Sequence, residues 1–414
     1  MKFSLFSRSF VVFLIATSAC GCSDDAAEAE PGTATCDITV SPGADDTKAL
    51  QTAFVEAQSG NTICLSPGTY AINDLITVGA TPGLTIRGTG ATPAEVMLDF
   101  IGQVQGDDGM LATGDDITIE NFSVKNTRKN GIVVRGATGV VFRDIHVSWD
   151  RGPSTDNGAY AIYPTSSEDV LIEGCEVYGA SDAGIYLGQS KNSIVRRNKA
   201  WGNVIGIEVE NTVGAEIYEN EAYDNTVGIF IPLLPNLQRT LSEHTIVRDN
   251  KLYENNRENF GDVNTVVSFL PPGVGIILLN SDKVRVFDNE IKHHDSSGIG
   301  VVGQSTMDEV TGSPADDPKT DGFPEDIYIH DNLIEDFGAK PAGILATLAV
   351  TPLEAIVWDG SERSAGSAKL CLGENPPSFR NFNGLAGVGD PSKHSTDASP
   401  FKCTADALAP IVLP

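Results

Sequence analysis

The chain has 414 residues, of which 41% are hydrophobic and 20% charged, and it carries 42 glycines and 22 prolines. It is longer than one ordinary domain, and its glycine and proline content is typical of many short strands joined by tight turns. The formal net charge is -28. A polyanion would be repelled by most of this surface, so nucleic acid is excluded as a partner.

The N-terminus has the pattern of an export signal. Lys2 and Arg8 precede a short apolar run that ends at Ala16, which is too short to cross a membrane as a helix. The following residues resemble a bacterial lipobox with lipidated Cys20, with Cys22 or ordinary secretion as alternatives. We therefore predict a signal peptide over residues 1–20 and a flexible tether over 21–35. The protein is then exported to the outer membrane, periplasm or cell surface, and it contacts the membrane only through its N-terminal lipid.

Five cysteines lie beyond this segment. An exported chain reaches an oxidising compartment, in which disulfides form and persist. Proximity in the sequence favours two pairs, Cys36 with Cys64 and Cys371 with Cys403, although spacing alone does not fix connectivity. Cys175 is then a buried free thiol.

The middle of the chain contains an irregular repeat, clearest from Ile117 to Leu345. Eight segments such as VVFRDIHV, TIVRDNKL and IYIHDNLI align on one pattern. Their sixth positions are Phe122, Ile145, Cys175, Asn198, Asn220, Asn250, Asn289 and Asn332. The steps between these positions are 23, 30, 23, 22, 30, 39 and 43 residues. A basic coil of 22–23 residues with insertions of irregular length indicates a solenoid with surface loops.

A second strand follows in each coil, marked by a small residue and then Ile. These pairs end at Ile132, Ile162, Ile185, Ile207, Ile229, Ile276, Ile299 and Ile344. Apolar residues alternate in both strands, so one face points inward and neighbouring coils must stack to bury it. The five Asn residues suit a bend with left-handed backbone, with side-chain amides bonding along the stack. The pattern predicts an all-β, single-stranded right-handed parallel β-helix.

Both ends of such a stack need a cover, because an open coil is an exposed sheet edge. Leu50, Ala53, Phe54 and Ala57 have helical spacing and predict an N-terminal cap helix near residues 46–58. This helix, the strand and PGTY turn after it, and the later IRG strand resemble the N-terminal cap of pectate-lyase-like proteins. We assign residues 36–348 to the β-helix and 349–414 to a disulfide-tied C-terminal cover.

The second strands also predict which side chains face outward. The residue after each Ile gives the row Val133, Tyr163, Tyr186, Glu208, Phe230 and Ile277, flanked by Tyr160, Asp182, Arg135 and Glu210. Coils stack about 4.8 Å apart, so the middle of this row is expected to form an exposed ridge of aromatic rings and acids. Such a ridge suits a carbohydrate ligand, and stacking that merely stabilises the sheet is the alternative.

Four long insertions are expected near this ridge, over residues 148–158, 233–243, 255–273 and 303–325. Acid–base candidates are Asp150, Asp156, Asp182, Glu208 and Glu210, with Arg135 and Arg151 available for a substrate carboxylate. We predict no bound cofactor. The acidic stretches Asp107-Asp108, Asp115-Asp116 and Asp316 to Asp321 nevertheless have the oxygen ligands that Ca²⁺ prefers. His293 and His294 are adjacent and are expected on the surface.

The β-helix pattern resembles that of polysaccharide lyases and mannuronan C5-epimerases. In the epimerases a Gly-Ile strand leads into a catalytic Asp-Pro-His-Asp motif. The equivalent stretch in this chain keeps Pro164 but has Tyr163, Thr165 and Ser166 where the motif has Asp, His and Asp. The epimerase mechanism is therefore not supported.

Residues 159–236, with NVIGIEVENT and TVGIFIPLLPNL, are more similar to a family of exported parallel β-helix repeat proteins. Members of that family are often encoded beside a secreted c-type cytochrome. This resemblance implies fold and export but no activity. Three functions follow as hypotheses: carbohydrate binding on the predicted ridge, a non-catalytic scaffold that docks an exported protein such as a cytochrome, or a polysaccharide lyase or epimerase.

Overall fold

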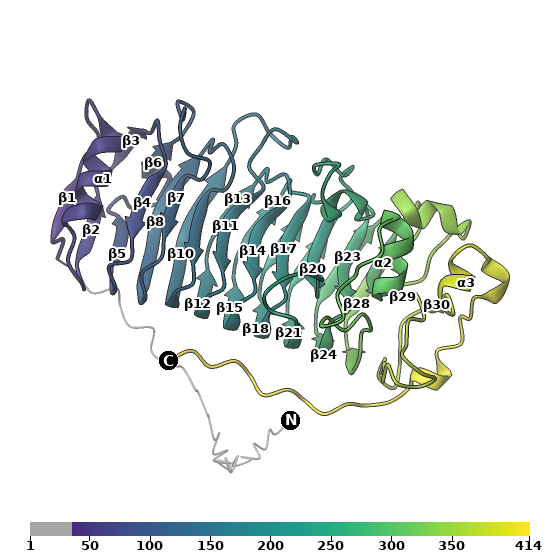
Figure 1. The fold of residues 1–414 in the computed structure, drawn as a ribbon. Coiled ribbons are helices and arrows are strands. Elements are labelled where there is room, and N and C mark those ends of the chain that lie inside the picture. Colours follow the sequence, from purple (N-terminus) through teal and green to yellow (C-terminus); the bar gives the residue numbers. More distant parts are fainter. Residues whose placement is uncertain (1–34) are drawn as a thin grey trace, which may run out of the picture. The chain divides into compact units, whose positions relative to one another are not determined.

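The computed structural model describes residues 35–414, so the predicted signal peptide, Cys20 and the tether lie outside the described residues. Residues 36–414 form one unit, in which parallel strands wind into a solenoid (Figure 1). Each middle coil contributes two short strands to sheet A and one to sheet B. No helix among the described residues is long and apolar enough to span a membrane.

Sheet A has 19 strands and bends sharply between the two strands of most coils. Its strands are β1 (Ile38–Val40), β2 (Thr62–Leu65), β3 (Gly68–Ala71), β5 (Thr85–Gly88), β6 (Val96–Asp99), β8 (Ile117–Lys125), β10 (Thr138–Ser148), β12 (Glu168–Glu173), β13 (Glu176–Tyr178), β15 (Lys191–Arg196), β16 (Lys199–Trp201), β18 (Val213–Tyr218), β19 (Glu221–Tyr223), β21 (Glu243–Arg248), β22 (Lys251–Tyr253), β24 (Asp282–Phe287), β25 (Glu290–His294), β27 (Ile327–His330) and β28 (Leu333–Phe337).

Sheet B has 11 strands that follow one another along the stack. They are β4 (Ile76–Gly79), β7 (Met110–Ala112), β9 (Ile132–Arg135), β11 (Tyr160–Thr165), β14 (Ala183–Gly188), β17 (Ile205–Glu210), β20 (Val227–Pro232), β23 (Val274–Leu279), β26 (Ser297–Val302), β29 (Ile356–Trp358) and β30 (Phe379–Asn381). Helices lie at the ends and in the loops: α1 (Asp46–Glu56), α2 (Gln304–Thr311) and α3 (Leu385–Val388), with 3-10 turns η1 (Pro93–Glu95), η2 (Val266–Phe269), η3 (Gly343–Leu348), η4 (Pro391–Lys393) and η5 (Ser399–Phe401).

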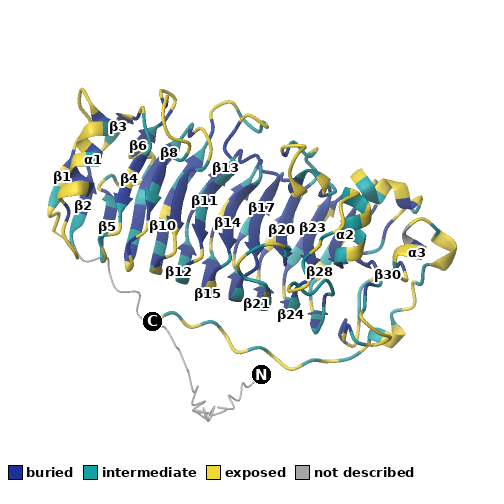
Figure 2. Cartoon of the chain, viewed as in Figure 1, coloured by how far each residue is buried: buried dark blue, intermediate teal, exposed yellow. Residues whose placement is uncertain are grey.

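Inward side chains of successive coils stack in register and form one continuous core. For example, Ile172, Val195, Ile217 and Val247 are direct strand partners and are all fully buried. The strands are accordingly dark in Figure 2, while the loops and the outer side of α1 are exposed. Stacking alone buries this apolar surface, because a single coil has no partner on either side.

The predicted Asn stack is confirmed as a hydrogen-bonded ladder. The Oδ1 atom of Asn220 accepts from both the backbone N–H and the Nδ2 of Asn198, at 3.0 and 2.9 Å. Asn220 in turn donates its N–H and Nδ2 to Oδ1 of Asn250. The same pattern continues through Asn289 to Asn332. Each bend is therefore satisfied by the neighbouring coil.

The left-handed backbone of this bend lies one residue earlier than the sequence predicts. Positive φ angles occur at the residue before each of the eight sixth positions of the repeat: Asn121, Asp144, Gly174, Arg197, Glu219, Asp249, Asp288 and Asp331. This residue turns the chain so that the following Asn side chain points into the solenoid. The amide can then bond along the stack, which an outward side chain cannot do.

A second ladder runs through Asn203, Asn225 and Asn255, with Nδ2 to Oδ1 distances of 3.0 and 2.9 Å. It ends on His294, whose Nε2 lies 3.1 Å from Nδ2 of Asn255. The expectation that His294 is a surface residue is wrong, because it is 1% exposed. Burial lowers the pKa of His294 to about 3, so its ring is neutral at physiological pH.

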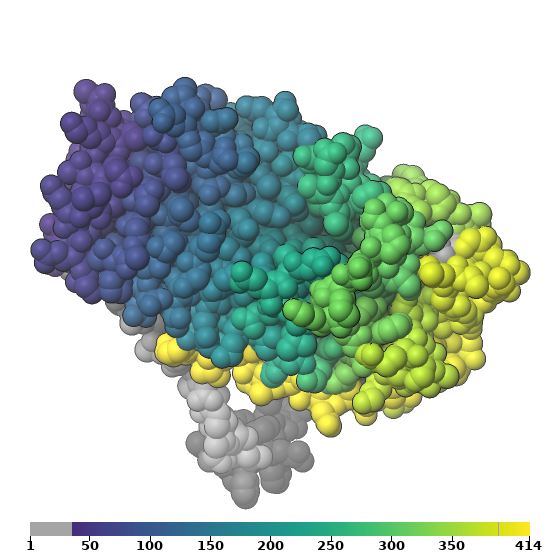
Figure 3. Space-filling model, viewed as in Figure 1, coloured from purple at the N-terminus to yellow at the C-terminus, as the bar shows by residue number. Residues whose placement is uncertain are grey.

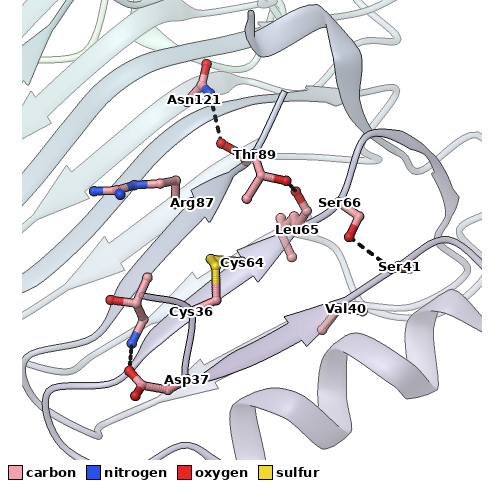
Figure 4. The surroundings of a disulfide bond; sticks show 12 residues. Cys36, Asp37, Val40, Ser41, Cys64, Leu65, Ser66, Arg87, Thr89 and Asn121 are labelled. Carbon is pink, nitrogen blue, oxygen red and sulfur yellow. Dashed lines mark hydrogen bonds between the residues drawn. A yellow bond between two sulfur atoms is a disulfide. The ribbon is translucent and has the colours of Figure 1, made fainter. Parts of the chain in front are cut away.

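The N-terminal end is closed as predicted. Helix α1 covers the first coils with Leu50, Ala53 and Phe54 buried, and its N-cap Asp45 accepts from the backbone N–H of Lys48. A disulfide joins Cys36 to Cys64, which lies on β2, confirming the predicted pair (Figure 4). The free thiol of Cys175 is buried, also as predicted, and burial raises its pKa to about 12.

The C-terminal end differs from the prediction. Gly343 and Ile344, expected to begin a strand, lie in the 3-10 turn η3. The strand that pairs with β26 is instead β29, and β30 follows it, so sheet B extends beyond the predicted boundary at residue 348. The repeat motif is displaced because the intervening segment folds over sheet B instead of joining it. The predicted disulfide between Cys371 and Cys403 is confirmed.

After Cys403 the chain runs in extended form back along the outside of sheet A. Figure 3 shows this yellow segment along the lower edge of the teal coils. The hydrogen-bonded pairs are Asp406 O with Arg285 Nε, Ala409 O with His244 Nε2, Ile411 N with Glu216 Oε2, and Val412 O with Asn192 Nδ2. The tail therefore contacts coils that are distant from it in the sequence.

Replacing Asn220 with Ala should destabilise the protein by about 3 kcal/mol, because it leaves the buried N–H of Asn198 and the buried C=O of Val195 on the preceding coil without partners. Chemical denaturation measures the change. Asn332→Ala is the matched control at the half-buried end of the same ladder, and its cost should be clearly smaller. Equal costs at both positions would mean that the ladder contributes no cooperative stability.

Candidate functional site

The outward row predicted from the sequence exists on sheet B. Ile162 pairs with Ile185, which places Tyr163 beside Tyr186. Tyr186 pairs with Glu208, and Glu208 pairs with Phe230. The row continues from Phe230 to Ile277 on β23. Residues from five consecutive coils thus line one face of the solenoid.

This row is not the exposed ridge that the sequence predicts. Tyr186 and Glu208 are each 4% exposed, and Phe230 is 2% exposed. Of the flanking residues, Glu210 is buried, Tyr160 and Asp182 are half-buried, and only Arg135 is exposed. The outward direction of these side chains was predicted correctly. Their exposure was not, because the repeat does not show which loops cover them.

The covering side chains come mainly from the insertion over residues 255–273. Val267 and Leu270 are buried against Tyr186 and Phe230, and Phe260 packs at the margin of the same apolar cluster. The insertions also brace one another. Thr155 Oγ1 donates to the carbonyl oxygen of Phe260 at 2.8 Å, and Asn236 N donates to Asp317 Oδ2 at 2.8 Å. The insertions thus lie at this face of sheet B, as the sequence predicts, and they also partly cover it.

Six residues form what we call the acid–tyrosine cluster: Tyr160, Tyr163, Asp182, Tyr186, Glu208 and Glu210. The three tyrosine rings contact one another with centroid distances of 4.5 to 4.8 Å. The Tyr186 hydroxyl donates to Glu210 Oε1 at 2.5 Å, and the Tyr160 hydroxyl donates to Asp182 Oδ2 at 3.2 Å. Two of the three carboxyl groups are therefore held by tyrosine hydroxyls from neighbouring coils.

Gly188 makes room for this arrangement. Gly188 pairs with Glu210 on the next coil, and the Tyr186 ring lies over it on the way to that carboxyl group. A Cβ atom at position 188 would lie 2.2 Å from the Tyr186 hydroxyl oxygen. The absence of a side chain here is thus a requirement of the cluster.

Burial raises the pKa of all three carboxyl groups. The pKa of Asp182 rises to about 7, chiefly through burial and also through the nearby Glu210 charge. The pKa of Glu208 lies well above its usual range, because the group is desolvated and sits near Asp182 and Glu210. The pKa of Glu210 is also raised by burial. Burial therefore favours the protonated form of all three groups, and Asp182 lies near its titration midpoint at neutral pH.

One polar atom in the cluster has no partner in the protein. Glu208 Oε2 is buried and makes no hydrogen bond among the described residues. An unsatisfied buried polar atom costs about 1–3 kcal/mol and marks a position that needs another explanation. Tyr160, Tyr163 and Asp182 lie half-buried beside it, and exposed Arg135 is near enough to lower the pKa of Tyr163 against the effect of burial. Half-buried hydrogen-bonding groups thus lie close to a buried one that has no partner.

The comparisons with known proteins agree with this architecture. The family model described as "Right handed beta helix region" matches residues 108–240. A search of curated proteins finds no match. Among solved structures, the mannuronan C-5 epimerase AlgE4 A-module of Azotobacter vinelandii has a TM-score of 0.53 at 13% identity, covering 77% of this chain and 88% of that one.

The chain is a right-handed parallel β-helix.

Two other solved structures are less similar to this β-helix. The AlgE6 A-module of Azotobacter vinelandii has a TM-score of 0.47 at 15% identity, covering 73% of this chain and 79% of that one. An alginate lyase from Paenibacillus sp. str. FPU-7 has a TM-score of 0.48 at 15% identity, covering 72% and 97%. At these identities the likeness concerns the fold alone, so activity must be argued from the site.

The remaining acidic candidates of the β-helix lie outside the cluster and have protein partners. Asp150 accepts from Lys125 and Asn126, and Asp156 lies beside Arg151. In the acidic stretches proposed for Ca²⁺, carboxylates also accept from nearby side chains or backbone: Asp107 from Lys129, Asp108 from Asn130, Asp115 from Thr138 and Asp317 from Thr320. Over residues 35–414, no three His, Cys, Asp or Glu side chains are grouped so that they could hold a metal.

Sheet A also carries an aromatic ladder that was not predicted from the sequence. Tyr178, Trp201, Tyr223 and Tyr253 stack on consecutive coils, and the last three rings are nearly parallel. Each lies three positions after a ladder position of the repeat, which is the signal that could have revealed it. Because the rings stack face to face along the solenoid, this ladder stabilises sheet A and leaves mainly ring edges toward solvent.

The acid–tyrosine cluster predicts a pH dependence of stability. A carboxyl group with a raised pKa in the folded state binds its proton more tightly there than in the unfolded chain. Its stabilising contribution is complete below the unfolded pKa and is lost as pH rises through the folded pKa. For Asp182 this window runs from about pH 4 to about pH 7, and melting temperature should fall across it.

Glu208→Gln should flatten this pH profile, because it removes one of the buried ionisable groups whose pKa is raised in the folded state. Melting curves from pH 4 to pH 8 measure the effect. Glu309→Gln is the matched control, because it removes the same charge from an exposed position. If both variants keep the slope of the parent protein, the cluster does not titrate as described.

Proposed function

We propose that this chain is an exported protein that binds carbohydrate at the acid–tyrosine cluster. The observation that carries the proposal is the unpaired Oε2 atom of buried Glu208, close to the half-buried Asp182 and in the same cluster as the half-buried Tyr163. A protonated carboxyl group can donate as well as accept a hydrogen bond, as sugar hydroxyls require. Tyrosine supplies an apolar ring next to a polar hydroxyl, which matches the mixed surface of a sugar ring.

The charge of the cluster also bears on the ligand. Because burial raises the pKa of Glu208 and Glu210, these two groups oppose an anionic sugar less than exposed carboxylates would. Arg135 is exposed near Tyr163 and carries five N–H donors suited to a carboxylate. Uronic acids and neutral sugars are therefore both within the proposed ligand class.

Export is supported by the two disulfides at opposite ends of the solenoid, because disulfides persist in oxidising compartments. The predicted signal segment and lipidated Cys20 belong to the same proposal. An experiment on the native host separates the alternatives. Mass spectrometry of the mature N-terminus should find a lipid on Cys20, and an unmodified N-terminus would indicate simple secretion.

Carbohydrate binding is tested by titrating the protein with uronate and neutral oligosaccharides in a calorimeter. Tyr163→Ala should weaken binding at least tenfold, because it removes the half-buried ring at the mouth of the cluster. Tyr178→Ala is the matched control, since it removes a half-buried tyrosine from sheet A of the same coil region. A loss of affinity that is equal in both variants, or no binding to any oligosaccharide, would contradict the proposal.

A further inference from the structure

A second hollow lies on the same face, beyond Phe230. It is a cavity of about 90 Å³ between the outward side chains of sheet B and the segments that fold over them. Ile277 and Val357 line its floor, and Leu270, Met307 and Leu345 line its roof from the three covering segments η2, α2 and η3. The lining is almost wholly apolar. A void of this kind excludes ordered water, because water needs two to four polar partners.

The cavity exists because the row has no side chain at Gly300. Gly300 pairs with Ile277 on one side and with Val357 on the other, so an apolar side chain would continue the row. A Cβ atom at Gly300 would lie 3.8 Å from Val357 and 4.0 Å from Ile277, which is ordinary contact. The backbone of Gly300 also does not have a left-handed, positive φ angle. Neither backbone geometry nor steric crowding therefore requires glycine here.

Other glycines of sheet B provide the contrast. A Cβ atom at Gly206, Gly228 or Gly275 would approach a carbonyl oxygen of the next coil to 2.6 or 2.7 Å. Those three positions exclude any side chain, whereas Gly300 has room for one. Glycine within a strand costs about 0.5–1 kcal/mol relative to alanine, and it often marks close approach of another molecule. The free space above Gly300 is therefore a candidate binding site.

An amphipathic groove adjoins the cavity. This groove, of about 690 Å³, shares Phe269, Leu270, Val310 and Ile344 with the cavity. Its outer part is lined by polar groups, among them Glu258, Asn259, Ser268 and Thr347. An apolar cavity beside a groove that carries polar groups is complementary to a molecule with an apolar end and a polar end.

We propose that the cavity above Gly300 binds the alkyl or acyl chain of a small amphiphile, with its polar head in the groove. A 150 Å³ apolar cavity holds the six carbons of benzene. By this proportion, 90 Å³ accommodates about four carbons. The ligand class is therefore a polar molecule carrying a chain of about four carbons. This site is additional to the acid–tyrosine cluster, from which Phe230 separates it.

The test uses n-alkyl β-glucosides from methyl to octyl, which share one head and differ only in chain length. Each buried methylene contributes about 0.8 kcal/mol, which is roughly a fourfold gain in affinity. Calorimetry should show this gain up to butyl and a plateau or decline beyond it. Equal affinity for all chain lengths, or no binding of the butyl compound, would overturn the proposal.

Two variants change the cavity in opposite directions. Gly300→Val fills it and should abolish the gain from methyl to butyl without lowering the melting temperature. Met307→Ala shortens a side chain in the roof and so enlarges the cavity. It should therefore move the preferred chain length beyond butyl. Val263→Ala is the matched control, because it trims an exposed apolar side chain that does not line the cavity.

The proposal is rejected if Gly300→Val folds and retains the chain-length preference of the parent protein. It is also rejected if Met307→Ala leaves the preferred length unchanged. Tyr163→Ala should keep the chain-length dependence, since it alters only the acid–tyrosine cluster. A failure of the proposed carbohydrate function is thus distinguishable from a failure of this second site.

Discussion

The hydrogen bonds of the asparagine ladders hold this molecule together in a way that no single coil can achieve. At each bend the backbone N–H and the side-chain amide of one coil donate to an amide oxygen of the next, as from Asn220 to Asn250. A coil without its neighbour would leave these buried groups unpaired. The amide oxygen also fixes the stacking register, since a slip of one residue would break both bonds. Every outward row on the surface inherits this register.

This dependence explains what could be predicted from the sequence. Offsets from the repeat identify strand partners, so the row from Tyr163 to Phe230 follows from counting residues. The cap helix and both disulfides follow from local spacing and from closeness along the chain. Two further ladders have the same spacing as the repeat. The ladder that ends at His294 lies five residues after its sixth positions, and the aromatic ladder through Trp201 lies three residues after them. Both ladders are therefore encoded in the repeat itself.

The burial of that row could not be predicted, because the repeat says nothing about how its insertions fold. In the sequence, Val267 and Leu270 are two apolar residues of a long loop. In the structure they belong to the same buried cluster as Phe230. The position of β29 could not be predicted for the same reason. The segment before β29 covers sheet B, although a strand was expected there at Gly343 and Ile344. One face of the solenoid is thereby divided at Phe230 into a half of buried acids and a half of apolar side chains. The spacing of the repeat predicts the order of residues along that face, whereas the fold of the loops determines how far each residue is buried.

The C-terminal tail changes how the solenoid resists unfolding. In a simple stack each coil interacts only with its two neighbours, so the terminal coils can fray while the middle remains intact. Here the chain from Cys403, itself tied by a disulfide, reaches Arg285, Glu216 and Asn192 in turn. Loss of the C-terminal end must therefore break contacts with coils near the centre. The tail converts a chain of nearest-neighbour interactions into a more cooperative unit, in which the end and the middle gain or lose structure together.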